Sequence, residues 1–283
     1  MTLPRRASRD PLKGATPAVR QSRPGGVPVF TARLRVWLQA LTVPALLLAL
    51  FEWYTRGPGA GSEALAPPSL ALKAFWGAAA DGSLWQATAF TLGSAALGLL
   101  IGAGLGVLLG IVLGLSPRAA RMSFLSIEVL RPVPSVALIP LSLLVFGFGV
   151  RMEVAVVAFA TFWPMLVLAQ AAARQVEPRL LEVALALGLS PQDRVLKIVI
   201  PAMVPRLFVA LRLGVAIALV VAVTVEIAAN PNGMGYAIMI AQQSLDPALM
   251  LAWLFWIGVV GFAVNDLAQR VQAWVARRMG VFQ

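Results

Sequence analysis

Six long apolar segments dominate the sequence and limit what the chain can fold into. They cover residues of about 36–54, 85–115, 124–146, 152–173, 204–228 and 248–268. Each is long enough to cross the roughly 30 Å hydrocarbon core of a bilayer as a helix. Hydrophobic residues make up 59% of the chain and charged residues only 12%, which leaves too little polar surface for a soluble domain. We therefore expect an all-α, polytopic membrane protein with six transmembrane helices.

Basic residues are distributed unevenly between the two sides of these segments. Six crossings place both termini on one side, and 19 of the 23 Lys and Arg residues fall on that side. The opposite side holds Arg56, Lys73 and Arg151, and Arg131 lies within the third segment. The positive-inside rule therefore predicts cytoplasmic termini in an inner membrane. This topology accounts for the net charge of +11 without a nucleic-acid partner.

The chain has no histidine and no cysteine. Disulfides and thiolate metal sites are excluded, and the side chain most often used as a general base or metal ligand is missing. We therefore expect no catalytic residue, no metal site and no cofactor bound by this chain.

Four regions are predicted along the sequence. They are a basic, disordered cytoplasmic tail at 1–35, a first transmembrane helix with an outer loop at 36–84, a membrane core at 85–270 and a cytoplasmic tail at 271–283. The outer loop has room for a short helix at 69–79. Ala64-Leu65-Ala66 resembles a signal-peptide cleavage site, but it follows an unusually long polar leader. We therefore expect the first helix to be retained as a signal anchor.

Glycines recur at every fourth position of the second apolar segment. The series is Gly98, Gly102, Gly106, Gly110 and Gly114. Residues spaced by four form a slowly winding stripe on a helix, and small residues let a second helix approach closely. We expect this stripe to serve packing within the chain, with a subunit interface as the alternative.

The cytoplasmic segment 174–203 has the pattern of two short amphipathic helices. Gly188 is placed to end the first helix in a left-handed conformation. Ser190, Pro191 and Asp193 supply the N-cap, the first-turn proline and the acidic first turn of the second helix. We expect this second helix to stop near Pro201. The exposed apolar residues of both helices call for a groove on another protein, with a membrane surface as the alternative.

A fixed spacing runs through the same segment. Glu182-Val183-Ala184 is followed by three residues, Gly188, nine residues and Ile198-Val199-Ile200-Pro201. This resembles the E-A-A, G, I-x-L-P motif of permease subunits of bacterial ABC importers. Val183 and Ile200 depart from the motif and keep an apolar side chain.

The resemblance extends over residues of about 85–270. Two motifs are similar to those of the branch that imports sulfonates, taurine and nitrate. They are Arg131-Pro132-Val133-Pro134 and Asn232-Gly233-Met234-Gly235-Tyr236, with Glu226 before the second. The first 80 residues carry no such resemblance.

The resemblance implies a type I ABC importer permease fold and a set of partners. These are two ATPase subunits that bind ATP and Mg, an extracytoplasmic solute-binding protein, a second permease chain as a homodimer, and the lipid bilayer. The chain itself has no G-x-x-x-x-G-K-[ST] loop for phosphate. The resemblance also implies an ATPase-coupling loop, in which Glu182 makes a polar contact and Gly188 provides the bend. The residues of this loop are Glu182, Val183, Ala184, Gly188, Ile198 and Pro201.

Charged and glycine residues within the segments are the candidates for a substrate pathway or gate. They are Glu226, Arg131, Asn232, Gly233 and Gly235. Glu128 and Arg131 are three residues apart and can pair. Glu226 has no local partner in the sequence, so a pathway role and a structural hydrogen bond both stay open. Arg131 is a structural anchor or a substrate contact. Arg131 suits an anionic substrate, whereas Glu226 suits a cationic or neutral heterocycle.

Three rival interpretations follow from the same residues. A stand-alone secondary transporter or channel would have to rely on Glu226 and the Glu128–Arg131 pair. An intramembrane enzyme is disfavoured because no acid pair shares one helix face. A structural anchor that recruits an ATPase would keep the loop but tolerate changes at Glu226 and at residues 232–235.

Overall fold

All regular structure in the described part of the chain is helical. The computed structural model describes residues 29–60, 62 and 64–279, and the expectation of an all-α protein is confirmed. The chain divides between residues 49 and 50 into two units. The first unit contains the N-terminal part of α1 (Val29–Arg56), and the second contains the remaining elements.

The predicted tail at 1–35 lies mostly outside the described residues. Its last seven residues belong to α1, and the disordered tail stays a prediction. Arg33 and Arg35 are good helix formers, and the helix therefore extends beyond the apolar segment that it contains.

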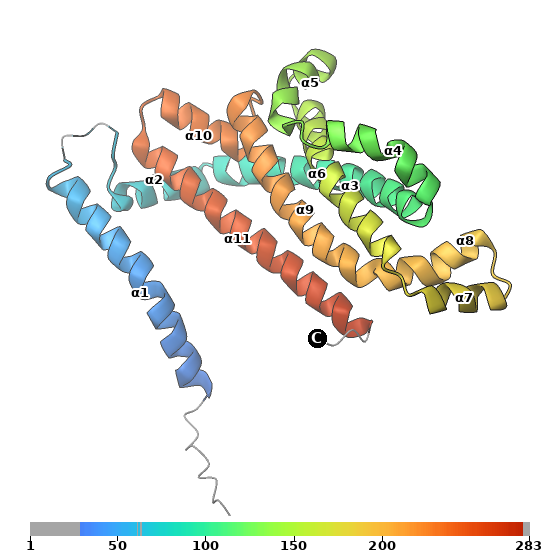
Figure 1. Cartoon of the computed structure of the whole chain (residues 1–283). Coiled ribbons are helices and arrows are strands. Elements are labelled where there is room, and N and C mark those ends of the chain that lie inside the picture. The colour runs from blue at the N-terminus through green and yellow to red at the C-terminus, as the bar shows by residue number, and fades with distance from the viewer. Residues whose placement is uncertain (1–28, 61, 63, 280–283) are drawn as a thin grey trace, which may run out of the picture. The chain divides into compact units, whose positions relative to one another are not determined.

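The second unit contains nine further α-helices of eight or more residues and three shorter helical turns (Figure 1). They are α2 (Pro68–Ala80), α3 (Ser83–Leu115), α4 (Pro117–Leu130), the 3-10 turn η1 (Ser135–Leu138), α5 (Ile139–Phe146), α6 (Val150–Arg174), α7 (Pro178–Ala186), α8 (Pro191–Arg194), the π turn η2 (Val195–Val199), α9 (Ile200–Ala228), α10 (Gly233–Gln243) and α11 (Pro247–Arg278). The outer helix expected at 69–79 corresponds to α2.

Four helical stretches of the described chain are long and apolar enough to cross a membrane. They are α3, α6, the run from α8 to α10, and α11. A fifth crossing results if α4 and the η1–α5 stretch count as one bent span. The second apolar segment is a single helix of 33 residues, as expected. The first apolar segment lies in α1, and its membrane crossing stays a prediction.

The third apolar segment is not one straight helix, which corrects the sequence-based prediction. Its two halves meet at an angle of 82° between Leu130 and Ser135. Pro132 and Pro134 lie in the break. A proline lacks the backbone N–H and disfavours helical geometry in the residue before it, so two prolines in three residues end α4 and turn the chain.

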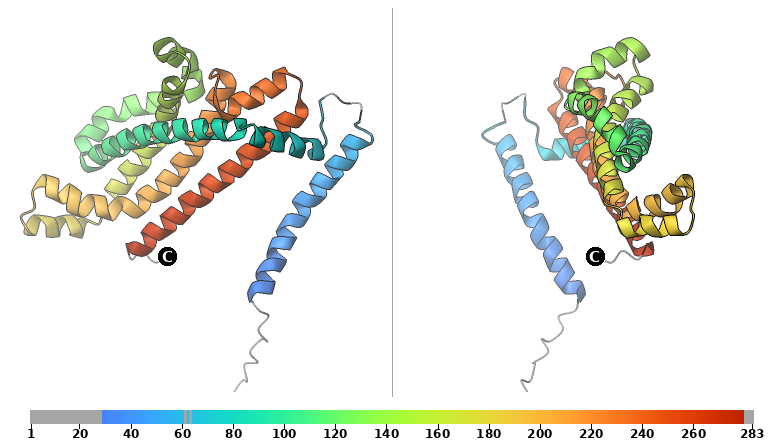
Figure 2. Two further views of the ribbon diagram at one scale, coloured as in Figure 1. Left: turned by 180° about the vertical axis from the view of Figure 1, so that it is seen from behind. Right: turned by 45° about the vertical axis from the view of Figure 1, so that its right-hand side comes forward.

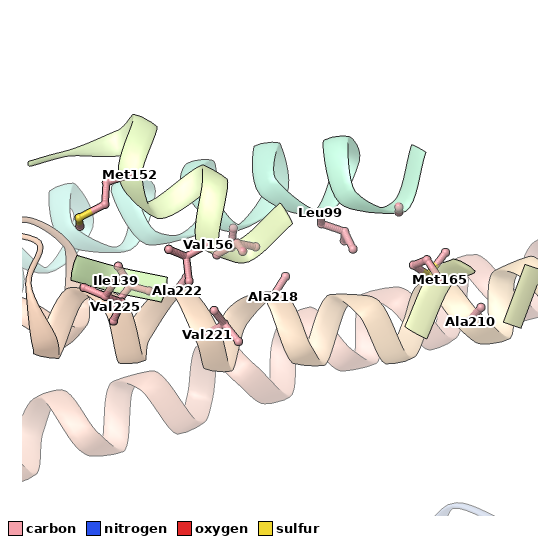
Figure 3. Packing of buried hydrophobic residues seen from close by; sticks show 13 residues of the cluster. Leu99, Ile139, Met152, Val156, Met165, Ala210, Ala218, Val221, Ala222 and Val225 are labelled. Carbon is pink, nitrogen blue, oxygen red and sulfur yellow. The ribbon is translucent and has the colours of Figure 1, made fainter. Parts of the chain in front are cut away.

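Helices α3, α6 and α9 pack together around the main hydrophobic core. Figure 3 shows the cluster spread along these helices, with Val156 of α6 near Ala222 of α9 and Met165 of α6 near Ala210 of α9. Ile139 of α5 covers one end of this cluster. In Figure 2, α7 and α8 lie at one end of α9, and α10 lies at the other. The two ends of one helix thus carry the two candidate sites described below.

The glycine stripe of α3 packs against α6 within the chain. A Cβ atom added at Gly106 would come within 2.6 Å of the Phe162 carbonyl oxygen, and one at Gly110 within 2.6 Å of the Leu166 carbonyl oxygen. Gly98 and Gly114 face the carbonyls of Val154 and Gln170 in the same way. Each step of four residues along the glycines of α3 matches a step of four residues along the facing carbonyls of α6. The two helices therefore run parallel, with their backbones in close contact.

Helix α11 continues through Arg278, past the boundary predicted at residue 270. The cytoplasmic tail at 271–283 stays a prediction, and residues 280–283 lie outside the described residues. An ion pair of 2.6 Å joins Asp266 to Arg270 one turn later. The Arg278 guanidinium lies 4.6 Å from the centre of the Trp274 ring. These contacts between successive turns support a polar extension of α11.

Candidate functional site

The first helix of the predicted coupling loop ends at Gly188 as the sequence indicates. Gly188 has a φ of +65°, in the left-handed region that favours glycine. The Leu189 N–H donates to the Ala184 carbonyl over 3.0 Å, and the Gly188 N–H donates to the Leu185 carbonyl over 3.0 Å. This pair of hydrogen bonds is the Schellman arrangement, which satisfies carbonyls at the end of α7.

The second helix of the loop begins at the predicted cap. The Ser190 hydroxyl oxygen accepts the Asp193 N–H over 3.1 Å and donates to the Asp193 carboxylate over 2.8 Å. Lys197 forms an ion pair of 2.7 Å with Asp193. These contacts fix the first turn of α8.

The second helix does not stop near Pro201, and that expectation is wrong. The helical path runs through α8 and η2 into α9 without a break. Bonds in a π turn reach five residues back instead of four. The widened turn at Val195–Val199 therefore lets the chain pass Pro201, which has no N–H to donate.

The loop presents an apolar face that nothing in the described chain covers. Val183, Leu185, Leu187 and Leu196 are exposed, and the Leu187 side chain is 70% accessible. Glu182 lies beside them and is also exposed. Ala184, in contrast, is fully buried where α7 packs on η2. The motif thus separates into a buried small residue and a surrounding exposed surface.

A second polar site lies buried at the opposite end of α9. Glu226 of α9 and Glu153 of α6 are both fully buried, and their carboxyl groups are close enough to interact. The Ser94 hydroxyl donates to Glu153, and the Asn230 amide nitrogen donates to its other oxygen. Neither acid forms an ion pair within the described residues. Hydrogen bonds thus take the place of charge pairing, but Oε1 of Glu226 is buried without a hydrogen-bond partner among the described residues.

The N-terminus of α10 is held by side chains from two other helices. The Gly235 N–H donates to Oε2 of Glu226 over 2.8 Å, and the Met234 N–H donates to the Thr91 hydroxyl oxygen over 2.9 Å. The first N–H groups of a helix have no partner within it. Glu226 and Thr91 thus supply the missing acceptors, and a carboxyl group there also suits the helix dipole.

The two glycines of the Asn232–Gly235 motif are required by close approach. Gly233 has a φ of +91°, and an added Cβ there would collide with the Glu226 carboxyl group. A Cβ at Gly235 would come within 2.8 Å of the Glu226 Cβ. The Asn232 amide donates to the Asn230 side-chain oxygen over 3.4 Å. The structure therefore brings together four of the five pathway candidates.

Glu226 has no partner near it in the sequence, but the folded chain provides partners from other helices. Its partners come from α6 and α10, and they include Glu153, which the sequence analysis missed. Glu153 begins the fourth apolar segment, and an ionisable residue in such a segment is itself a signal for a functional or structural site. Ser94 and Thr91 carried no such signal, because small polar residues are common in transmembrane helices. Asn230 carried none because it lies in the connection between α9 and α10.

Arg131, the fifth candidate, lies apart from this cluster. It pairs with Glu128 at 3.6 Å, as predicted. It also lines a cavity formed with α6 and α9. Arg131 and Glu226 therefore belong to different sites.

Comparison with known protein families matches the helices that carry both sites. Residues 102–281 match the family described as binding-protein-dependent transport system inner membrane component. The chain belongs to this family. Its members are ABC importer permeases, so the chain is a multi-pass membrane transport subunit and not a catalytic enzyme.

Relatives of this permease match along most of their length. A putative aliphatic sulfonates transport permease protein of Bacillus subtilis is 31% identical over 237 residues, covering 83% of this chain and 86% of the relative. A riboflavin transport system permease protein of Chloroflexus aurantiacus is 33% identical over 248 residues, covering 84% and 90%. A nitrate import permease protein of Synechococcus elongatus is 33% identical over 186 residues, covering 64% and 65%.

A solved structure shows the same fold. The permease is similar to a chain of the MetNI methionine ABC transporter in an inward-facing conformation, with a TM-score of 0.57 and 18% identity. The match covers 68% of this chain and 94% of that chain. The expected type I importer permease fold is confirmed.

Proposed function

We propose that this permease forms the translocation pathway of an ATP-driven importer for a small solute such as a sulfonate, taurine or nitrate. An extracytoplasmic binding protein delivers the solute, and two separate ATPase subunits bind ATP and Mg. Two copies of the permease enclose the pathway. The protein lies in the inner membrane, with its termini in the cytoplasm. The chain itself holds no cofactor.

The observation that carries this proposal is the exposed apolar face of the α7–α8 loop. Exposure of apolar side chains to water at the tip of a polar cytoplasmic loop costs free energy. Burial of these side chains in a groove on another protein removes that cost. Gly188 marks the turn between the two helices, and a Cβ added there would meet nothing within 4 Å. The turn is therefore free to enter a cleft on an ATPase subunit, with Glu182 available for a polar contact.

The loop is connected to the membrane helices by a continuous backbone and a shared core. Val199 and Met203 are fully buried against Ala172 and Ala173 of α6. A displacement of the loop is therefore transmitted to both α9 and α6. ATP can favour one state of the pathway only through contacts that differ between states, and this loop would provide those contacts.

Co-purification from native membranes tests the proposal. Gly188→Trp places a bulky side chain at the docking turn and is expected to abolish recovery of the ATPase. Gly82→Trp is the matched control, since Gly82 also has a positive φ, of 84°, and open space around its Cβ. Gly82 lies just before the start of α3, and Leu115 and α4 lie at the opposite end of that helix. The Gly82→Trp variant is therefore expected to retain the ATPase.

A stand-alone transporter is the second candidate, and the buried Glu153–Glu226 pair favours it. Recovery of well-folded wild-type permease without any ATPase, in gentle detergent, would contradict the importer proposal. Solute uptake by the permease alone in proteoliposomes would then establish the alternative.

A further inference from the structure

A groove of about 390 Å³ lies between α9 and α11, which pack against each other (Figure 1). Arg212 of α9 bonds to Asn265 of α11. Leu219, later in α9, lies beside Gly261, earlier in α11, so the two helices run antiparallel. The groove is lined by the N-terminal half of α9 and the C-terminal end of α11. It therefore lies at the end of the helix pair where α9 is joined to the α7–α8 loop.

Two arginines from different helices line this groove. They are Arg212 of α9 and Arg277 of α11, and both are exposed. The Arg212 Nε donates to the Asn265 side-chain oxygen over 3.3 Å, which positions the guanidinium and leaves most of its five N–H donors available. The side chains of a helix lean toward its N-terminus. Since α9 and α11 run antiparallel, the two guanidinium groups lean toward each other along the groove.

Among the described residues, no carboxylate neutralises these two arginines. The part of the groove that the structure describes contains no Asp or Glu. Elsewhere in α11, Arg270 pairs with Asp266 at 2.6 Å, and Arg278 lies over the Trp274 ring. The groove thus combines two positive charges without a negative partner, which favours an anionic ligand.

The apolar part of the groove indicates a ligand that comes from the membrane. Helices α9 and α11 belong to stretches that are long and apolar enough to cross a bilayer. Phe208 and Val209 line the groove together with Arg212, and Val209 is 57% exposed. An anionic phospholipid carries its phosphate group beside its acyl chains, and basic pockets between transmembrane helices bind such headgroups. A free anion would leave the apolar wall of the groove uncovered.

We propose that the groove between α9 and α11 binds an anionic phospholipid, whose phosphate group pairs with Arg212 and Arg277. The side-chain amides of Gln269 and Gln272, which also line the groove, donate to the remaining headgroup oxygens. The acyl chains lie along the apolar side chains of α9. The bound lipid links α11 to the helix that carries the α7–α8 loop, whichever solute the permease transports.

Lipid-dependent stabilisation tests the site. The permease is purified from native membranes with the subunits that accompany it. Its melting temperature is measured while dioleoyl phosphatidylglycerol, or neutral dioleoyl phosphatidylcholine, is added to the detergent. A saturable increase is expected with phosphatidylglycerol only. Arg212→Gln and Arg277→Gln each remove one charge from the groove and are expected to weaken the apparent affinity about fivefold, the effect of one basic residue near an anionic headgroup.

Two further variants separate the groove from other effects. Arg278→Gln removes the same charge one residue further along α11, where the side chain lies over Trp274 and does not line the groove, and it is expected to keep the wild-type affinity. Arg212→Lys keeps the charge and loses the Nε bond to Asn265. It is expected to bind within about twofold of the wild type, because lysine also pairs with phosphate.

An unchanged affinity in both glutamine variants of the groove would overturn the proposal. An equal loss in Arg278→Gln would also overturn it, because the lipid would then respond to general surface charge. So would an equal loss in Arg212→Lys and Arg212→Gln, which would assign the effect to the bond with Asn265. Stabilisation by inorganic phosphate in place of phosphatidylglycerol would show a free-anion site instead. Each of these results leaves ATPase co-purification intact and so is distinguishable from failure of the importer proposal.

Discussion

The Gly235 N–H donates a 2.8 Å hydrogen bond to the Glu226 carboxyl group, and this contact fastens the start of α10 to the end of α9. The two residues lie on either side of a tight reversal of the chain. An ionisable residue within an apolar helix is therefore explained here by a backbone group that needs an acceptor.

Glu226 variants should separate hydrogen bonding from charge. Glu226→Gln keeps an oxygen that accepts the Gly235 N–H and is expected to retain most of the stability. Glu226→Ala leaves that buried N–H unpaired and should lower the free energy of unfolding by about 1–3 kcal/mol. Thermal unfolding in detergent measures both. Equal losses in the two variants would show that the hydrogen bond is not the main contribution.

Thr91 is expected to matter through its hydroxyl oxygen. That oxygen accepts the Met234 N–H over 2.9 Å. Thr91→Val keeps the shape and removes the acceptor, so we expect a loss of about 1–3 kcal/mol. Thr91→Ser keeps the hydroxyl and is the matched control. Protection of the α10 amides in hydrogen exchange should fall in the valine variant alone.

Gly106 and Gly104 on α3 should respond in opposite ways to alanine. A Cβ at Gly106 would meet three atoms of α6 at 2.6 to 3.0 Å, whereas one at Gly104 would meet nothing within 4 Å. Gly106→Ala is expected to destabilise the permease by about 1–3 kcal/mol through overpacking. Gly104→Ala should be neutral or stabilising, because alanine is favoured over glycine in a helix. Melting temperatures of the two variants test this contrast, and similar values would contradict the α3–α6 packing.

Single cysteines can test the orientation, since the chain has none of its own. Lys73 and Gln192 are both exposed. In intact cells, a membrane-impermeant maleimide should label Lys73→Cys, and it should label Gln192→Cys only after the inner membrane is opened. Leu166→Cys, at a fully buried position, is expected to stay unlabelled in both cases. The reverse pattern would place the termini outside.

Features that depend on nearby residues could be predicted from the sequence. The Gly188 turn and the Ser190 cap are examples, because capping and left-handed turns are decided by residues within one helical turn. The length of α3 was predicted for the same reason, since an unbroken apolar run without proline has one favourable conformation in a membrane. The bend at 131–134 is not predicted, although its prolines are visible in the sequence. The prediction of one helix relies on the continuous apolar character of residues 124–146 and gives the prolines no weight.

Contacts between distant segments were decided only by the tertiary structure. The sequence indicated that the glycines of α3 permit close packing, but not that α6 is the helix that approaches them. It drew attention to Glu226 and missed Glu153, because the two acids meet only when α6 packs beside α9. Arg212 and Arg277 likewise line one groove only in the folded chain. Local residue patterns thus determined the helices and the loop, whereas burial, which depends on how helices pack, determined the partners of each polar group.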